Sequence, residues 1–240
     1  MKDVKTPPDN RMHDWSARFA QLALEARHPA LQKFYQAGVV CAQTAIDSVQ
    51  LLAMDVETTG LDAQANSIVS IGLLPCTLQR IRCREAQYWL VKPSSELSGK
   101  SVTFHHITHA EISGAPAFGE IVETLLDAMA GKIMVVHYRT IERGFLNQAF
   151  LKHLGEGLQF PVIDTMQLEA RIHRQKQVWW KRLWRRPQQS IRLADSRARY
   201  NLPIYHAHHA LTDALATAEL LQAQVATHHG PAAPVGTLWN

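Results

Sequence analysis

The stretch LLAMDVETTGLD, residues 51–62, places two acidic residues at the end of a short apolar run. An apolar run of this length is typical of a buried strand, in which successive side chains point to opposite faces. Asp55 and Glu57 are therefore expected on one face, and Met54 and Val56 on the other. Two ionised carboxylates this close repel each other, and a hard cation such as Mg²⁺ relieves that repulsion. The pair alone fits either a cation site at a strand end or a solvated acidic turn.

The residues that follow, Thr58, Thr59 and Gly60, favour a ligand site over a solvated turn. Gly60 permits a tight turn or a close approach of the backbone to a ligand. Backbone N–H groups in such a turn can hold a phosphate, and the two threonine hydroxyls lie beside the acids.

A second polar cluster, HHALTDA at residues 208–214, lies near the end of the chain. Asp213 is expected on a helix, and His208 precedes it by five residues, which is about 140° away around a helix. His208 is therefore expected on the loop before that helix, reaching the same site from another side. Because the pKa of histidine lies near neutrality, a histidine beside a metal-bound water is a suitable general base.

Positive charge is concentrated in one part of the chain. Residues 171–186 contain seven Lys/Arg and no Asp/Glu, which more than accounts for the formal net charge of +4 over 240 residues. Such a local basic segment usually contacts phosphates or an anionic surface. The three cysteines show no metal-ligand spacing, and neither a secretory signal nor a transmembrane segment is visible, so a cytoplasmic protein with reduced thiols is expected.

The order of elements predicts an α/β domain. A polar arm and a helical extension are expected over 1–47, with one helix from the cap Asp14 to about Ala37, then a main domain over 48–227 and a flexible tail over 228–240. In the main domain a strand meander precedes alternating helices and strands, which is typical of a mixed sheet flanked by helices. Strands are expected at 49–57, 68–74, 86–92, 133–137 and 160–164, and helices at 118–129, 140–155, from 165 and at 209–227.

Three segments, DVETTGLD, HYRTIERGFL and HHALTDA, resemble in order and spacing the three motifs of the DEDDh 3′–5′ exonucleases. This family includes the polymerase III epsilon proofreading subunit, ribonuclease T and oligoribonuclease. FHHIT and PVIDT also resemble family segments, so the resemblance covers roughly residues 48–226. It implies a ribonuclease H-like fold with a mixed five-stranded sheet, and hydrolysis of terminal phosphodiesters to nucleoside 5′-monophosphates.

The resemblance also implies roles for individual residues. Two divalent cations, Mg²⁺ or Mn²⁺, would be held by Asp55, Glu57, Asp213 and a fourth acid. His208 would deprotonate the attacking water. Residues that would line the place of the terminal nucleotide are Thr58, Gly60, Leu61, His105 and Ile107.

The middle motif departs from the family pattern. Glu142 stands where the fourth metal-binding aspartate is expected, and it keeps the charge while adding one methylene group. We interpret Glu142 as a substituted ligand, although water-mediated binding or a weakened enzyme also fits. Asp164, at the end of a predicted strand, fits either support of the site or a cap for the helix that follows.

The basic segment carries tryptophans among its positive charges. This pattern is typical of single-stranded nucleic-acid binding, with Lys181 and Arg182 as expected contacts. A membrane-surface contact and plain packing of the tryptophans beneath a solvated basic rim stay open.

Three classes of function follow from these patterns. The first is a metal-dependent 3′–5′ exonuclease that acts on nucleic acid 3′ ends, with single-stranded DNA as the expected substrate and a polymerase or repair protein as a possible partner. The N-terminal extension and the short sequence beyond Thr227 favour a stand-alone nuclease, or one that docks on a polymerase differently from the epsilon subunit. The second is a catalytically weakened nucleic-acid-binding module with the same fold. The third, a zinc protein using the histidine clusters, matches no tetrahedral ligand spacing.

Overall fold

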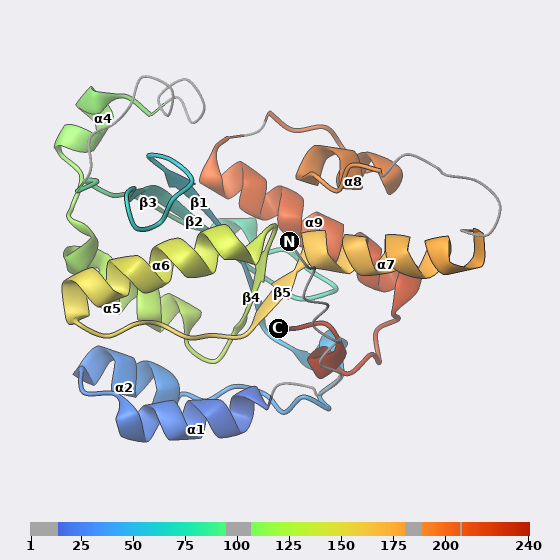
Figure 1. Cartoon of the computed structure of the whole chain (residues 1–240), viewed down its shortest axis with the longest axis horizontal. Coiled ribbons are helices and arrows are strands. Elements are labelled where there is room, and N and C mark those ends of the chain that lie inside the picture. Colours follow the sequence, from blue (N-terminus) through green and yellow to red (C-terminus); the bar gives the residue numbers. More distant parts are fainter. Residues whose placement is uncertain (1–13, 95–106, 181–188, 207) are drawn as a thin grey trace, which may run out of the picture.

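The computed structural model describes residues 14–94, 107–180, 189–206 and 208–240 (Figure 1). Within these residues one mixed five-stranded sheet has the strand order β3-β2-β1-β4-β5. β1 pairs antiparallel with β2 and parallel with β4, so β1 is the central strand. The ribonuclease H-like sheet expected from the sequence is thereby confirmed. Its strands are β1 (Leu51–Thr58), β2 (Ile68–Cys76), β3 (Gln87–Leu90), β4 (Ile133–Val136) and β5 (Val162–Asp164).

Helices cover both faces of this sheet. Met54 and Val56 of β1 pack with α5 and α6 on one face. Ala53 of β1 and Val135 of β4 pack with α7 and α9 on the other. The helices are α4 (His109–Ser113), α5 (Phe118–Met129), α6 (Arg139–Leu154), α7 (Thr165–Trp180), α8 (Leu193–Arg199) and α9 (Ala210–His228), and the 3₁₀ turns are η1 (Ile46–Ser48), η2 (Cys83–Glu85) and η3 (Val235–Thr237).

The N-terminal extension differs from the single helix expected up to Ala37. It forms α1 (Trp15–Glu25) and α2 (Pro29–Gln36), with Asp14 capping α1 through a hydrogen bond from the Ala17 N–H. The break falls at Pro29, which lacks an N–H group and fits only the first turn of a helix. Aromatic side chains of both helices are buried in the same core as α5 and α6, and the two helices lie together below them in Figure 1.

The segment after α9, where a flexible tail over 228–240 is expected, packs against the rest of the fold. Val235, Leu238 and Trp239 are at most 3% exposed. Asn240 exchanges backbone hydrogen bonds with Val162 of β5, and the Val235 N–H donates to the Thr44 carbonyl at 2.9 Å. Helix α9 ends before Gly230, which has φ 79° and donates to the Val225 carbonyl, and the prolines that follow do not prevent the apolar side chains from being buried.

The basic segment is not separate from the preceding helix, because α7 continues through its first ten residues to Trp180. Lys181 and Arg182 lie outside the described residues, as does the remainder of the segment up to 188. Among the residues that are described, none of the helices has both the length and the apolar character needed to cross a membrane.

Candidate metal centre

The central strand β1 delivers the first two carboxylates. Asp55 lies opposite Gly72 of β2, and Glu57 lies opposite Ser70. Because side chains alternate along a strand, both acids project from the same face of the sheet, which is the face that α9 covers. The register shifts between Glu57 and Thr58. A shift of this kind bends the strand locally, so the chain turns away from the sheet directly after the second acid.

Gly72 determines how closely α9 approaches these acids. A Cβ atom at Gly72 would lie 2.5 Å from the carbonyl carbon of Ala210, the first residue of α9. Only a residue without a side chain therefore lets the helix backbone rest on β2 beside Asp55. Sequence reasoning missed this residue, although an isolated glycine inside a strand pattern is a signal of close backbone approach.

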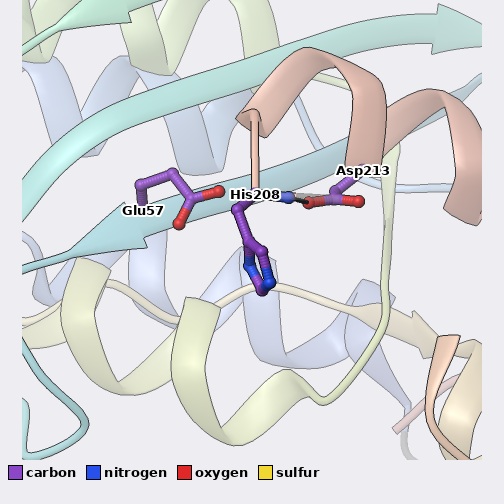
Figure 2. A group of neighbouring side chains, drawn as sticks. All are labelled: Glu57, His208 and Asp213. Atoms are coloured by element: carbon purple, nitrogen blue, oxygen red, sulfur yellow. Dashed lines mark hydrogen bonds between the residues drawn. The ribbon is translucent and has the colours of Figure 1, made fainter. Parts of the chain in front are cut away.

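Helix α9 and the loop before it supply Asp213 and His208, as expected. The Asp213 Oδ2 atom accepts a hydrogen bond from the His208 backbone N–H at 2.7 Å. Ligand atoms of Glu57, His208 and Asp213 all lie within 4.8 Å of one another. Figure 2 shows the three side chains converging from β1, the loop and α9.

Glu142 lies in the first turn of α6, the helix that packs on the opposite face of the sheet. It is 2% exposed, and its Oε2 atom is buried with no hydrogen-bond partner among the described residues. Its charge acts on Asp55, where it is the largest contribution after burial to the raised pKa. Ligand atoms are thus close together for Glu57, His208 and Asp213, and the charge of Glu142 acts on Asp55. That all five residues form one metal site stays a prediction.

Burial raises the pKa of all four carboxyls, and repulsion from the others adds to the raised pKa of Asp55 and Glu57. Burial raises the pKa of Asp55 well above its ordinary value, and the charges of Glu142, Glu57 and Asp213 raise it further. Burial raises the pKa of Glu142 to about 8. The pKa of Glu57 is raised to about 7, mainly by burial and to a lesser extent by the charge of Asp213. Burial also raises the pKa of Asp213, opposed by the hydrogen bond from the His208 N–H.

These residues fit a divalent cation. Four carboxyls that resist ionisation together become favourable ligands when positive charge lies between them. The unpartnered Glu142 Oε2 offers a buried oxygen that no group in the described chain satisfies. Oxygen-rich donor sets of this kind suit Mg²⁺ and Mn²⁺.

The loop after β1 is held by its own hydrogen bonds. The Thr58 hydroxyl donates to the Gly60 carbonyl at 2.7 Å, and the Thr59 N–H donates to the Ser67 carbonyl at 2.9 Å. Asn66 packs against Gly60, where a Cβ atom would meet its side chain at 2.6 Å. The loop therefore presents Leu61, which is 86% exposed, from a fixed backbone.

Asp164 caps two helices, which confirms the cap interpretation. Its Oδ1 atom accepts from the N–H groups of Met166 and Gln167 in α7 and of Tyr138 at the start of α6, and its Oδ2 atom accepts from the Arg139 N–H. The two helices run in opposite directions from this point in Figure 1. One buried carboxylate thereby fixes the origin of α6, the helix that carries Glu142.

A cavity of about 250 Å³ adjoins the acids. Asp55, His208 and Asp213 border it on one side, and α8 with the loop after it borders it on the other. His137 also lines it, and burial lowers the pKa of His137 to about 4. The His137 ring therefore stays neutral and donates from Nε2 to the Ile191 carbonyl at 3.1 Å.

Other expected nucleotide contacts lie in different surroundings. Ile107 is buried with Val69 and Ile112 in a small separate cluster, so its contact with a nucleotide stays a prediction. His105 lies outside the described residues, as do Lys181 and Arg182.

A ribonuclease H-like sheet that gathers four carboxylates and a histidine around its central strand defines the DEDDh class of exonucleases. Residues 52–221 match the RNase T family model, described as exonuclease, and the chain belongs to this family.

Curated relatives agree with that family. The chain is 27% identical over 177 residues to a DNA polymerase III PolC-type protein of Lacticaseibacillus paracasei, covering 73% of the chain and 11% of that protein. It is 30% identical to a DNA polymerase III subunit epsilon-like protein of Rhodobacter capsulatus, over 54% of the chain and 18% of the relative. The chain thus spans only a small part of the length of these relatives.

Solved structures share the fold. Exonuclease X in complex with 5′ overhanging duplex DNA aligns with a TM-score of 0.59 and 22% identity, covering 78% of this chain and 98% of that one. The nuclease domain of 3′hExo, a DEDDh family member bound to rAMP, aligns with a TM-score of 0.62 and 13% identity, covering 75% and 92%. At these identities the likeness concerns the fold alone.

Proposed function

We propose that this chain hydrolyses the terminal phosphodiester at the 3′ end of nucleic acid, with single-stranded DNA as its substrate, and releases nucleoside 5′-monophosphates. The observation that carries the proposal is the cluster of Glu57, Asp213 and His208, beside the buried Asp55 and Glu142 carboxyls of raised pKa, on a fold of the exonuclease family. Family membership supports the reaction class, and the geometry supports the assignment of residues.

Asp55, Glu57, Glu142 and Asp213 would hold two divalent cations, Mg²⁺ or Mn²⁺, which when bound polarise the scissile phosphate and lower the pKa of a bound water. The residues of the chain do the rest. His208 is exposed on its loop and accepts the proton of the attacking water. Its backbone N–H holds Asp213 Oδ2, which keeps the ring beside the carboxylates.

The loop after β1 would hold the terminal nucleotide. Its hydrogen bonds fix the backbone of residues 58–67 before substrate arrives, so little conformational entropy is lost on binding. The exposed Leu61 side chain offers an apolar surface for the last base. Thr58 and Gly60 place backbone groups next to the acids.

A second candidate is a nucleic-acid-binding module with little catalysis, and Glu142 is the observation that favours it. Its carboxyl has a pKa of about 8 and must release a proton before it can bind a cation. A weak second cation site would leave substrate binding intact and lower turnover.

The similarity to PolC-type proteins also supports the proposal that this chain has a polymerase partner.

The test is one assay series with purified protein, Mg²⁺ or Mn²⁺, and labelled single-stranded DNA, duplex DNA and RNA. We expect mononucleotide release that is fastest on single-stranded DNA and absent after Asp55→Ala. Binding of DNA without release in either cation would favour the binding module. Release that survives Asp55→Ala would remove the carboxylate centre from the reaction.

A further inference from the structure

Arg197 on α8 is a buried cation that the metal centre does not explain. It is 4% exposed, and a guanidinium at this depth is costly unless its N–H groups are hydrogen-bonded. Its Nη1 atom donates to the Ala216 carbonyl of α9 at 2.6 Å. Its Nη2 atom donates to the Pro203 carbonyl at 2.8 Å and to Glu219 Oε2 at 2.7 Å. One side chain therefore joins α8, α9 and the segment between them.

Tyr205 completes this arrangement. The Arg197 guanidinium lies 4.6 Å from the centre of its ring, and its hydroxyl donates to Glu219 Oε1 at 3.0 Å. Both oxygens of Glu219 are thus used, one by each partner. We call Arg197, Tyr205 and Glu219 the α8–α9 clamp.

The clamp holds a segment, residues 201–206, that leads to His208. Asn201 at its start has φ 54°, and His208 has φ 74°. Non-glycine residues rarely adopt these left-handed conformations, which persist only where surrounding contacts impose them. The clamp supplies such contacts at Pro203 and Tyr205, between the two bends.

We propose that Arg197 is a positioning residue for hydrolysis, which acts through Glu219 and Tyr205 to hold the His208 ring against the carboxylates. This inference rests on the proposed function of His208 as the base. Arg197 also borders the cavity of about 250 Å³ shared by Asp55, His208 and Asp213. Loosening the segment displaces the ring, and a displacement of about 1 Å in a catalytic group can cost on the order of 10²-fold in rate.

The test is a double-mutant cycle of Arg197→Met with His208→Ala, measured as single-turnover hydrolysis in Mn²⁺. We expect Arg197→Met to lower the rate about tenfold or more in the otherwise unchanged protein, with KM for DNA and Mn²⁺ affinity within about twofold. In the His208→Ala background the same substitution should change the rate less than about twofold. An equal loss in both backgrounds would overturn the proposal, because the effect would then not pass through His208.

Arg199→Met is the matched control. Arg199 lies on the same helix and donates to the buried Glu169 at 2.8 Å, but its other contacts are Ser190 and Ser196. We expect a similar loss of stability from this variant and a rate within about twofold of the unchanged protein. A tenfold loss here as well would show that any damage to α8 suffices, which contradicts a specific clamp.

Two further measurements cover the case in which Arg197→Met does not fold. Tyr205→Phe removes the hydroxyl that contacts Glu219 and keeps the ring. We expect about threefold slower hydrolysis, and no such slowing in the His208→Ala background. Amide hydrogen exchange tests the clamp without any activity: residues 201–206 should exchange faster in Tyr205→Phe and at the original rate in Arg199→Met. Unchanged exchange and an unchanged rate in Tyr205→Phe would overturn the clamp. Absence of hydrolysis in the unmodified protein would instead overturn the proposed function.

Discussion

Glu142 on α6, whose charge raises the pKa of Asp55, is one methylene longer than the aspartate that the family resemblance implies at its position. The Glu142 side chain is 2% exposed, and one carboxyl oxygen has no hydrogen-bond partner within the described residues. Desolvation favours the protonated form, so cation binding and proton release at Glu142 are coupled.

Removing this carboxylate tests whether it is a ligand. We expect Glu142→Ala to lower Mg²⁺-dependent hydrolysis by about 100-fold or more, because one cation loses a ligand and the buried space is left open. The conservative variant Glu142→Asp should stay within about tenfold of the original rate. Steady-state rates with DNA decide the matter, and an unchanged rate in Glu142→Ala would remove Glu142 from the site.

The raised pKa values of Glu57 and Glu142 make the metal-free protein sensitive to alkali. Their folded values of about 7 and about 8 exceed the ordinary 4.5, so the stability they contribute is complete below pH 4.5 and is lost as the pH rises through 7 and 8. His137 has a folded pKa of about 4 against an ordinary 6.5, so it is largely neutral in both states above pH 6.5.

We therefore expect the free energy of unfolding without metal to fall between pH 6.5 and pH 9, at up to about 1.4 kcal/mol per pH unit for each proton retained. Glu142→Gln should fall less steeply, and Mn²⁺ should restore stability at the alkaline end. Urea unfolding at a series of pH values measures this. A metal-free stability that rises with pH over this window would contradict the raised pKa values.

At the residue scale, the motif residues could be predicted and their environment could not. Strand alternation predicts that Asp55 and Glu57 share a face, and the helical angle between His208 and Asp213 predicts that His208 lies on the loop before α9. The unpartnered oxygen of Glu142 and the contacts of Arg197 depend on segments far apart in the chain. No local pattern encodes such contacts.

At the scale of elements, the packing of α9 on β2 depends on the absence of a side chain at Gly72. We expect Gly72→Ala to destabilise the fold by about 1–3 kcal/mol, because its Cβ meets the Ala210 backbone at 2.5 Å and the helix must move. Hydrolysis should fall with it, since α9 carries Asp213.

Gly114→Ala is the control for this substitution. Gly114 has φ −98°, and nothing lies within 4 Å of the position of its Cβ, so the change in stability should stay within about 0.5 kcal/mol. Thermal unfolding of both variants compares them directly. Equal stability of Gly72→Ala and the original protein would show that α9 does not rest on β2 as described.

Helix α5 could be predicted from its apolar spacing, α9 from its run of alanine and leucine residues, and the central strands from their short apolar runs. The division into α1 and α2 depends on Pro29, whose effect competes with a helical pattern that continues across it. The short helix α4 depends on the reciprocal bonds of Thr108 and Glu111.

At the scale of the whole molecule, the segment after α9 ties distant parts of the chain together. Trp239 pairs with Ile163 of β5 in an isolated antiparallel β-bridge. The Asn240 carbonyl accepts hydrogen bonds from the side chains of Trp15 in α1 and Arg143 in α6. Arg143 is the neighbour of Glu142, so this segment also supports the helix that bears a metal ligand. The local sequence shows only the prolines, which predict a flexible end. The long-range contacts that hold this segment are not encoded in any local pattern.

We expect Trp239→Ala to destabilise the protein by about 3–5 kcal/mol, the usual cost of removing a buried large aromatic side chain. Leu24→Ala, at an 87% exposed position, should change stability by less than about 0.5 kcal/mol. Chemical denaturation measures both variants. An unchanged free energy of unfolding in Trp239→Ala would contradict the packing of this segment against the core.

The most direct measurement of the proposed function follows the two ends of one single-stranded DNA oligonucleotide during hydrolysis. With Mn²⁺, a 3′ label should leave as a nucleoside 5′-monophosphate in the first turnover, and a 5′ label should stay on a ladder of stepwise shortened products. Neither label should leave the full-length oligonucleotide, and the oligonucleotide should not shorten, in the presence of chelator or after Asp55→Ala. Loss of the 5′ label first, internal fragments without mononucleotide, or hydrolysis that persists in chelator would contradict a metal-dependent 3′–5′ exonuclease.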